Sequence, residues 1–75
     1  MSQSLFELHG AQVCPDEVAA MHETAQTYHS LARRFLDGAP DVIEADCLAA
    51  KDRADRAEWH AREVFRTLWS PTLHP

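Results

Sequence analysis

Two stretches of apolar residues repeat at heptad spacing on either side of a short segment that contains glycine and proline, and this pattern restricts the fold most. Spacings of three and four residues alternate along each stretch. Apolar residues at these intervals line one side of an α-helix and form the seam of a coiled coil. The seam residues are Val18, Met21, Ala25, Tyr28, Ala32 and Phe35 in the first stretch, and Ile43, Cys47, Ala50, Ala54, Ala57, Ala61, Val64 and Leu68 in the second. The sequence therefore predicts two long helices, the second rich in alanine.

Residues typical of helix ends fix the limits of these helices. Pro15 suits a first helical position, Gly38 suits a left-handed C-terminal cap, and Pro71 follows the second stretch. We expect helices over about 15–37 and 40–69, with an irregular tail at 70–75. Because the connection is only five residues long, the helices must run antiparallel. The predicted fold is all-α, a single helical-hairpin domain over residues 1–75.

Pairing Phe35 with Ile43 across the turn sets the remaining layers of the hairpin. The predicted pairs are Ala32 with Cys47, Tyr28 with Ala50, Ala25 with Ala54, Met21 with Ala57, and Val18 with Ala61. Large residues face alanine in the middle, which lets the two backbones approach closely. Continued backward, the first seam reaches Cys14, in the layer of Val64, and Ala11.

A capping-box pattern precedes the first long helix. Ser4 and Glu7 have the spacing in which each side chain caps the backbone of the other. We expect a short helical turn here that carries Leu5, Phe6 and Leu8 over the open end of the hairpin, near Leu68 and Trp69.

Several apolar residues lie off the seam, where a lone hairpin cannot bury them. Trp59 falls opposite the seam within a collar of charged residues, a composition typical of binding hot spots. The collar consists of Asp52, Asp55, Arg56, Arg62 and Arg66, and the other off-seam apolar residues are Leu31, Leu36, Leu48, Phe65 and Trp69. The predicted partner-binding residues are Leu48, Asp55, Trp59, Arg62, Phe65, Arg66 and Trp69. Because 75 residues give a small core, we expect self-association into a homodimeric four-helix bundle or binding to another protein.

Charge and hydropathy argue against other classes of partner. Twelve acidic residues outnumber seven basic ones, for a net charge of -5, and the two signs are intermixed. A nucleic-acid module normally presents a basic face, so nucleic acid is an unlikely partner. No apolar run is long enough to span a membrane, and residues 1–10 lack the features of a secretory signal. A cytoplasmic protein is expected.

The cysteines and histidines do not form a recognisable site. Cys14 and Cys47 fall in layers about 25 Å apart, too far for a disulfide, so Cys47 is expected to be buried as a small apolar residue. Cys14 begins a helix, where a thiolate is stabilised, and a reactive role stays open.

His22 and His29 share a helical face but lie about 10 Å apart, too far to bind one metal ion. Pairing of His22 with Glu58 and of His60 with Glu17 is the simpler expectation. No catalytic constellation, metal site or cofactor motif is present, and no enzymatic activity is expected.

Two families of helical hairpins are architecturally similar. The stretch Arg33-Arg34-Phe35-Leu36-Asp37-Gly38-Ala39-Pro40 between alanine-rich helices resembles the hairpin co-chaperones of type III secretion needle subunits. The hairpin as a whole resembles the dimeric RNA-binding hairpin of plasmid copy-number control, although no RNA-contact face is evident. Helical hairpins are common, so neither resemblance transfers a function. The leading hypothesis is a small non-catalytic interaction module, an adaptor, regulator or inhibitor such as phages and plasmids encode.

Overall fold

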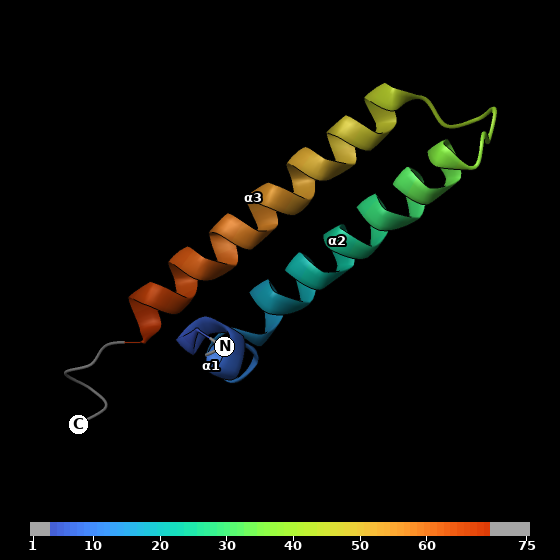
Figure 1. Cartoon of the computed structure of the whole chain (residues 1–75). Coiled ribbons are helices and arrows are strands. Elements are labelled where there is room, and N and C mark those ends of the chain that lie inside the picture. The colour runs from blue at the N-terminus through green and yellow to red at the C-terminus, as the bar shows by residue number, and fades with distance from the viewer. Residues whose placement is uncertain (1–3, 70–75) are drawn as a thin grey trace.

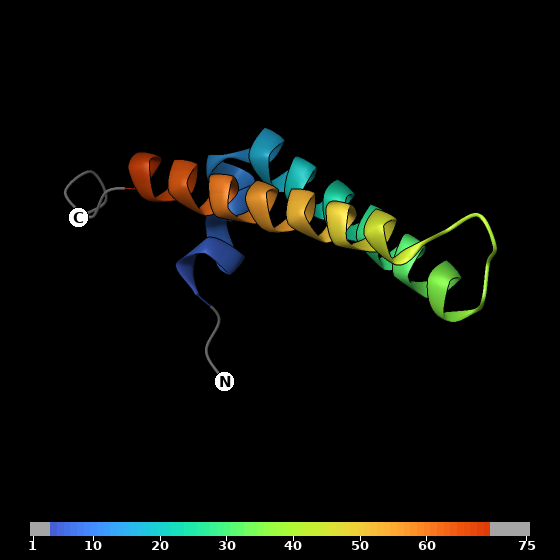
Figure 2. The ribbon, with the colours of Figure 1, turned by 90° about the horizontal axis from the view of Figure 1, so that it is seen from above.

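The computed structural model describes residues 4–69, which form three α-helices (Figure 1). Helix α1 spans Leu5–Val13, α2 spans Pro15–Leu36 and α3 spans Glu44–Leu68. Helices α2 and α3 run antiparallel and side by side, as the sequence predicted, while α1 crosses the end of the hairpin opposite the turn (Figures 1 and 2). The predicted helical turn is thus a nine-residue helix. The predicted irregular tail at 70–75 lies outside the described residues.

Helix α2 has its predicted limits to within one residue. Pro15 occupies its first position, and Asp16 and Glu17 in the first turn favour the positive end of the helix dipole. Arg33 and Arg34 stand in its last turn. Gly38 then adopts φ 84°, a left-handed conformation that other residues rarely adopt. These local signals explain why the prediction succeeded here.

Helix α3 begins at Glu44, four residues later than predicted, so the connection spans residues 37–43. The Ile43 amide donates to the Asp46 carboxylate, 3.2 Å away, which caps the start of the helix. Val42 is buried, whereas Phe35 and Ile43 are exposed. The predicted layer of Phe35 with Ile43 is therefore wrong, because the longer connection folds Val42 inward instead.

An ion pair joins the end of α2 to this connection. The Arg34 guanidinium donates to the Asp41 carboxylate, and this hydrogen bond holds the pKa of Asp41 below its ordinary value. Both side chains are more than half exposed. The pair therefore fixes the course of the loop and contributes little to stability.

The seam between α2 and α3 is confirmed over much of its length. Val18, Cys47, Ala50 and Ala61 are buried, and Ala61 has no exposed surface. The other alanines of the seam, together with Met21, are half-buried. At the end of α3 the pattern fails, because Leu68 is 51% exposed.

The chain breaks its helix at Cys14, so the predicted continuation of the seam holds for the buried Cys14 but is wrong for Ala11. Cys14 has φ -138° and ψ 71°, outside the helical region, and Ala11 is exposed. A residue before proline is disfavoured in helical geometry, and Pro15 therefore enforces the break. The Cys14 thiol lies 3.7 Å from the Ala61 carbonyl, and Val64 packs against the same core cluster.

Helix α1 closes the open end of the hairpin with one large side chain. The Ser4 hydroxyl accepts a hydrogen bond from the Glu7 amide at 3.2 Å, which confirms the Ser4 half of the predicted capping box. Phe6 is buried edge-on against Phe65, with ring centroids 5.5 Å apart. A Cβ on Gly10 would lie only 3.2 Å from the Phe6 ring, so glycine allows this close packing.

Leu5 and Leu8 stay more than half exposed, contrary to the expectation that all three apolar side chains cover the hairpin. The core cluster at this end consists of Phe6, Cys14, Val18, Ala61 and Phe65.

Candidate protein-binding surface

One stripe of α3 faces away from α2 and carries most of the predicted partner-binding residues. We call it the outer α3 surface, and it consists of Leu48, Asp52, Asp55, Trp59, Arg62 and Arg66. Helical geometry places these residues on the side opposite Ala50 and Ala57 of the seam. No other described helix lies along this side of α3 (Figure 1). The stripe is therefore open in the described part of the chain except at Arg62, whose guanidinium lies over the Phe6 ring of α1, 4.7 Å from the ring centroid.

Trp59 is the most prominent side chain of the outer α3 surface. It is 66% exposed, and Leu48, about 16 Å away along the helix, is 59% exposed. A hollow of about 270 Å³ beside the Trp59 ring is lined by Asp55, Glu58 and Arg62. A large aromatic side chain held in water amid charged groups is the arrangement expected of an unoccupied binding hot spot.

The charged side chains of α3 are joined in short-range ion pairs. Their partners lie three or four residues apart on the same helix: Lys51 with Asp55, Arg56 with Asp52, Arg62 with Glu58, and Arg66 with Glu63. The Asp55 carboxylate raises the pKa of Lys51 by accepting its hydrogen bond. Such exposed pairs stabilise a protein by about 0–1 kcal/mol. Their main effect is to hold the charges in an ordered array.

Two predicted partner-binding residues do not lie on the outer α3 surface. Phe65 is only 7% exposed because α1 crosses α3 at this point, so the expectation that it lies outside the core is wrong. Trp69 is half-buried and stacks on Phe65 and on His9 of α1. Both aromatic side chains thus help to hold α1 in place.

Sequence reasoning placed Asp52 in the collar around Trp59 but omitted it from the binding residues, although it shares the stripe. A second exposed apolar group lies at the turn, and of its members only Leu36 was predicted to stay unburied. The group comprises Phe35, Leu36 and Ile43, of which Leu36 is 82% exposed. Phe35 and Ile43 occupy seam positions, so periodicity could not identify them as exposed.

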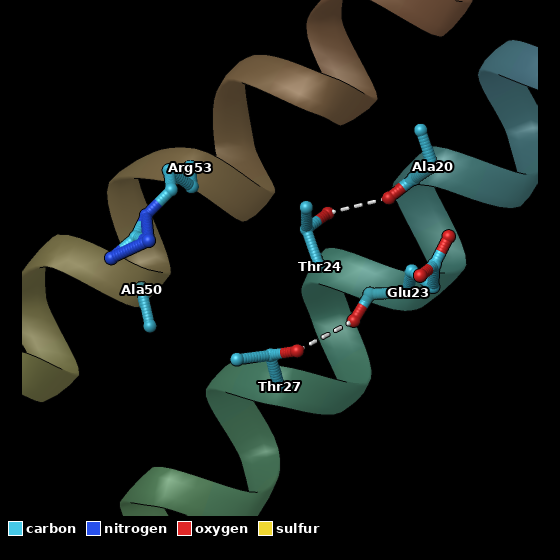
Figure 3. Close-up of a pocket in the computed structure, with 6 residues that line it drawn as sticks. All are labelled: Ala20, Glu23, Thr24, Thr27, Ala50 and Arg53. Carbon is cyan, nitrogen blue, oxygen red and sulfur yellow. Dashed lines mark hydrogen bonds between the residues drawn. The ribbon is translucent and has the colours of Figure 1, made fainter.

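A separate groove lies between α2 and α3, in a volume of about 230 Å³ (Figure 3). Its lining residues are Ala20, Glu23, Thr24, Thr27, Ala50 and Arg53. The Thr24 hydroxyl donates to the Ala20 and Met21 carbonyls, and the Thr27 hydroxyl donates to the Glu23 carbonyl. Because both hydroxyls are used within their own helix, the lining offers one cation, one carboxylate and small apolar groups. It does not pair a nucleophile with a base.

The predicted histidine ion pairs do not form. His22 and Glu58 line the same hollow, but the Glu58 carboxylate accepts a hydrogen bond from Arg62 at 3.1 Å. No ion pair between His60 and Glu17 is present among residues 4–69.

In the same part of the chain, no cluster of three or more potential metal ligands is found. No helix of the described residues is long and apolar enough to cross a membrane.

Both cysteines are free and buried, and Cys47 fills the small apolar site predicted for it. Cys14 is only 2% exposed. Burial raises the pKa of its thiol, and the nearby Glu17 carboxylate adds to the increase. The break at Cys14 therefore produces a protected thiol and not the stabilised thiolate that a helix start can provide.

We expect a thiol reagent to modify the native chain slowly near neutral pH, and the denatured chain rapidly at both cysteines. The folded state holds the Cys14 pKa above its ordinary value of about 8.5, so the protonated thiol contributes to the stability of the fold. This contribution is complete below that pH. It is lost as the pH rises through the raised pKa. Labelling with a chromogenic disulfide at a series of pH values, with Cys14→Ser as the control, would measure both effects. Rapid labelling of native Cys14 at neutral pH would contradict the expectation.

Comparison with protein-family models, with curated proteins and with solved structures finds no match to this chain.

Proposed function

We propose that this chain is a small non-catalytic protein–protein interaction module, which acts as an adaptor, regulator or inhibitor through the outer α3 surface. The observation that carries the proposal is the exposure of Trp59 at the centre of an ordered charged stripe. A tryptophan in this setting is costly to leave in water, and its burial against a partner contributes roughly 2 kcal/mol or more.

The balance of buried and exposed apolar residues supports the same function. Among residues 4–69, eight apolar residues are buried, and eight large ones are exposed. Three of the buried residues are alanine or valine on the hairpin seam. So small a core stabilises a chain only modestly, and covering exposed apolar side chains would add to its stability. The partner is either a second copy, whose α2 and α3 would bring four long helices together, or a different protein.

Nucleic-acid binding has less support. Four of the five basic side chains of α3 already pair with acidic neighbours, and the net charge is -5. A phosphate backbone requires an uncompensated basic face. The exposed Phe35, Leu36 and Ile43 at the turn favour instead a second way of binding a protein, through the tip of the hairpin.

Replacing Trp59 with alanine tests which of these surfaces is used. We expect Trp59→Ala to abolish association, measured by sedimentation of the purified chain and by capture of proteins from a native lysate, with folding unchanged by circular dichroism. The matched control is Leu36→Ala, which removes an even more exposed apolar side chain at the turn. Loss of binding in the control alone would assign the function to the turn. Equal binding by both variants, or none by the wild type in either assay, would refute the proposed function.

A further inference from the structure

The charges of the outer α3 surface are sorted by sign about Trp59. The two aspartates, Asp52 and Asp55, precede Trp59, and the two arginines, Arg62 and Arg66, follow it. Asp52 and Arg66 each lie seven residues from Trp59, while Asp55 and Arg62 lie four and three residues away. The stripe therefore has an acidic half and a basic half of matching lengths.

We propose that a second copy of this chain docks antiparallel on the outer α3 surface, with the two Trp59 side chains at the two-fold axis. This inference rests on the proposed function and specifies its partner. In a two-fold antiparallel contact, a residue that precedes the axis faces the residue equally far beyond it in the other copy. Asp52 then faces Arg66 of the second copy, and Asp55 lies within one residue of facing its Arg62. Every facing charge on the stripe is opposite in sign.

A third pair of residues at the edge of the stripe follows the same rule. Arg56 precedes Trp59 by three residues, and Glu63 follows it by four. Both lie on the flank of α3 opposite to Asp55 and Arg62, since successive helical residues are rotated by about 100°. A two-fold axis between antiparallel helices places the same flank of the two copies side by side. Arg56 therefore lies opposite Glu63 of the second copy. Six complementary pairs thus surround the two tryptophans.

Other arrangements of two copies lose this complementarity. In a parallel pair at the same register, Asp55 would face Asp55 and Arg62 would face Arg62. An antiparallel pair shifted to set Leu48 against Trp59 would bring Asp52 against Asp55 of the other copy. Like charges in direct apposition are repulsive, and the observed order of charges therefore selects the arrangement centred on Trp59.

The ion pairs within α3 do not prevent this contact. The Asp52 and Arg66 side chains are 59% and 75% exposed although each has a partner on its own helix. A carboxylate accepts several hydrogen bonds, so each aspartate can bind its own basic neighbour and an arginine of the second copy together. The hollow beside Trp59 provides space for the ring of the second Trp59.

This contact produces a flat layer in which α3 lies next to α3 and each α2 lies on the outside. It differs from the compact four-helix bundle that a shared seam would form. A single helix pair buries a small interface, so the dimer is weak and its dissociation constant rises with salt.

Charge reversal at the outermost pair provides the test. Sedimentation equilibrium of the full chain should show a monomer–dimer equilibrium for the wild type and a dissociation constant raised roughly tenfold by either Asp52→Arg or Arg66→Asp. An equimolar mixture of the two variants should form a one-to-one dimer of nearly wild-type strength, because both facing pairs are again opposite in sign. Asp37→Arg, which makes the same charge change in the connection, should leave the equilibrium unchanged.

Dimerisation of Asp52→Arg at the wild-type level, or failure of the mixture to restore the dimer, would overturn the proposed arrangement. So would a wild-type chain that is a monomer at every concentration tested. If that monomer still captures a lysate protein in a Trp59-dependent way, the proposed function stands and the partner is a different protein. If capture is absent as well, both proposals fail.

Discussion

Phe65→Ala is expected to remove most of the chain's stability at room temperature. Phe65 is 7% exposed, packs edge-on against Phe6 and stacks on Trp69 at a centroid distance of 5.6 Å. Truncating a buried phenylalanine costs about 3–5 kcal/mol. A chain of 75 residues with one small core is stable by only about 5 kcal/mol or somewhat more. Thermal denaturation followed by far-ultraviolet circular dichroism should show a melting temperature lowered by more than about 15 °C.

The matched control removes the same side chain where it is not enclosed. Phe35 at the turn is 39% exposed, and Phe35→Ala should cost much less than Phe65→Ala. A melting temperature close to that of the wild type for Phe65→Ala would show that α1 does not dock on α3. Equal losses for the two variants would place as much stabilising contact at the turn as at the α1 end.

Phe65 also shows where prediction from the sequence ended. Its position lies beside the seam, and in a two-helix hairpin it would be exposed. It is buried only because α1 crosses α3 there and brings Phe6 against it. Heptad periodicity describes contacts between parallel or antiparallel helices, and it carries no information about a short helix that packs crosswise.

The limits of the helices, too, were predictable only where neighbouring residues in the sequence determine them. The start of α2 was predictable because Pro15 and the acidic residues after it act locally. The start of α3 was not, because Ile43 fits the heptad pattern while its neighbour Val42 is the residue that the loop buries. Which of two adjacent apolar residues turns inward depends on the path of the connection, including the Arg34–Asp41 ion pair.

The outer α3 surface was the more predictable part of the candidate site. Leu48, Asp55, Trp59, Arg62 and Arg66 lie opposite the seam by helical geometry alone. The structure places them on one stripe, which is open except where Arg62 lies over the Phe6 ring of α1. Once the seam is known, the opposite face is known too. The roles of these residues in binding stay predictions, since they depend on a partner.

Ala61→Leu is expected to be the second most damaging single substitution. Ala61 has no exposed surface, its carbonyl lies 3.7 Å from the Cys14 sulfur, and it shares the core cluster with Val18. A leucine here must push α2 and α1 away from α3, which typically costs about 1–3 kcal/mol. Urea unfolding should show the loss as a lower midpoint with little change in slope.

Ala49→Leu is the appropriate control, because it makes the same change at an exposed position of the same helix. Alanine and leucine differ by only a few tenths of a kcal/mol in helix propensity, so this control should stay close to the wild type. The difference between the two variants isolates the cost of separating the helices at the layer of Val18 and Ala61. If Ala61→Leu proved as stable as Ala49→Leu, the helices could not be in close contact there, and alanine would not be required by the hairpin.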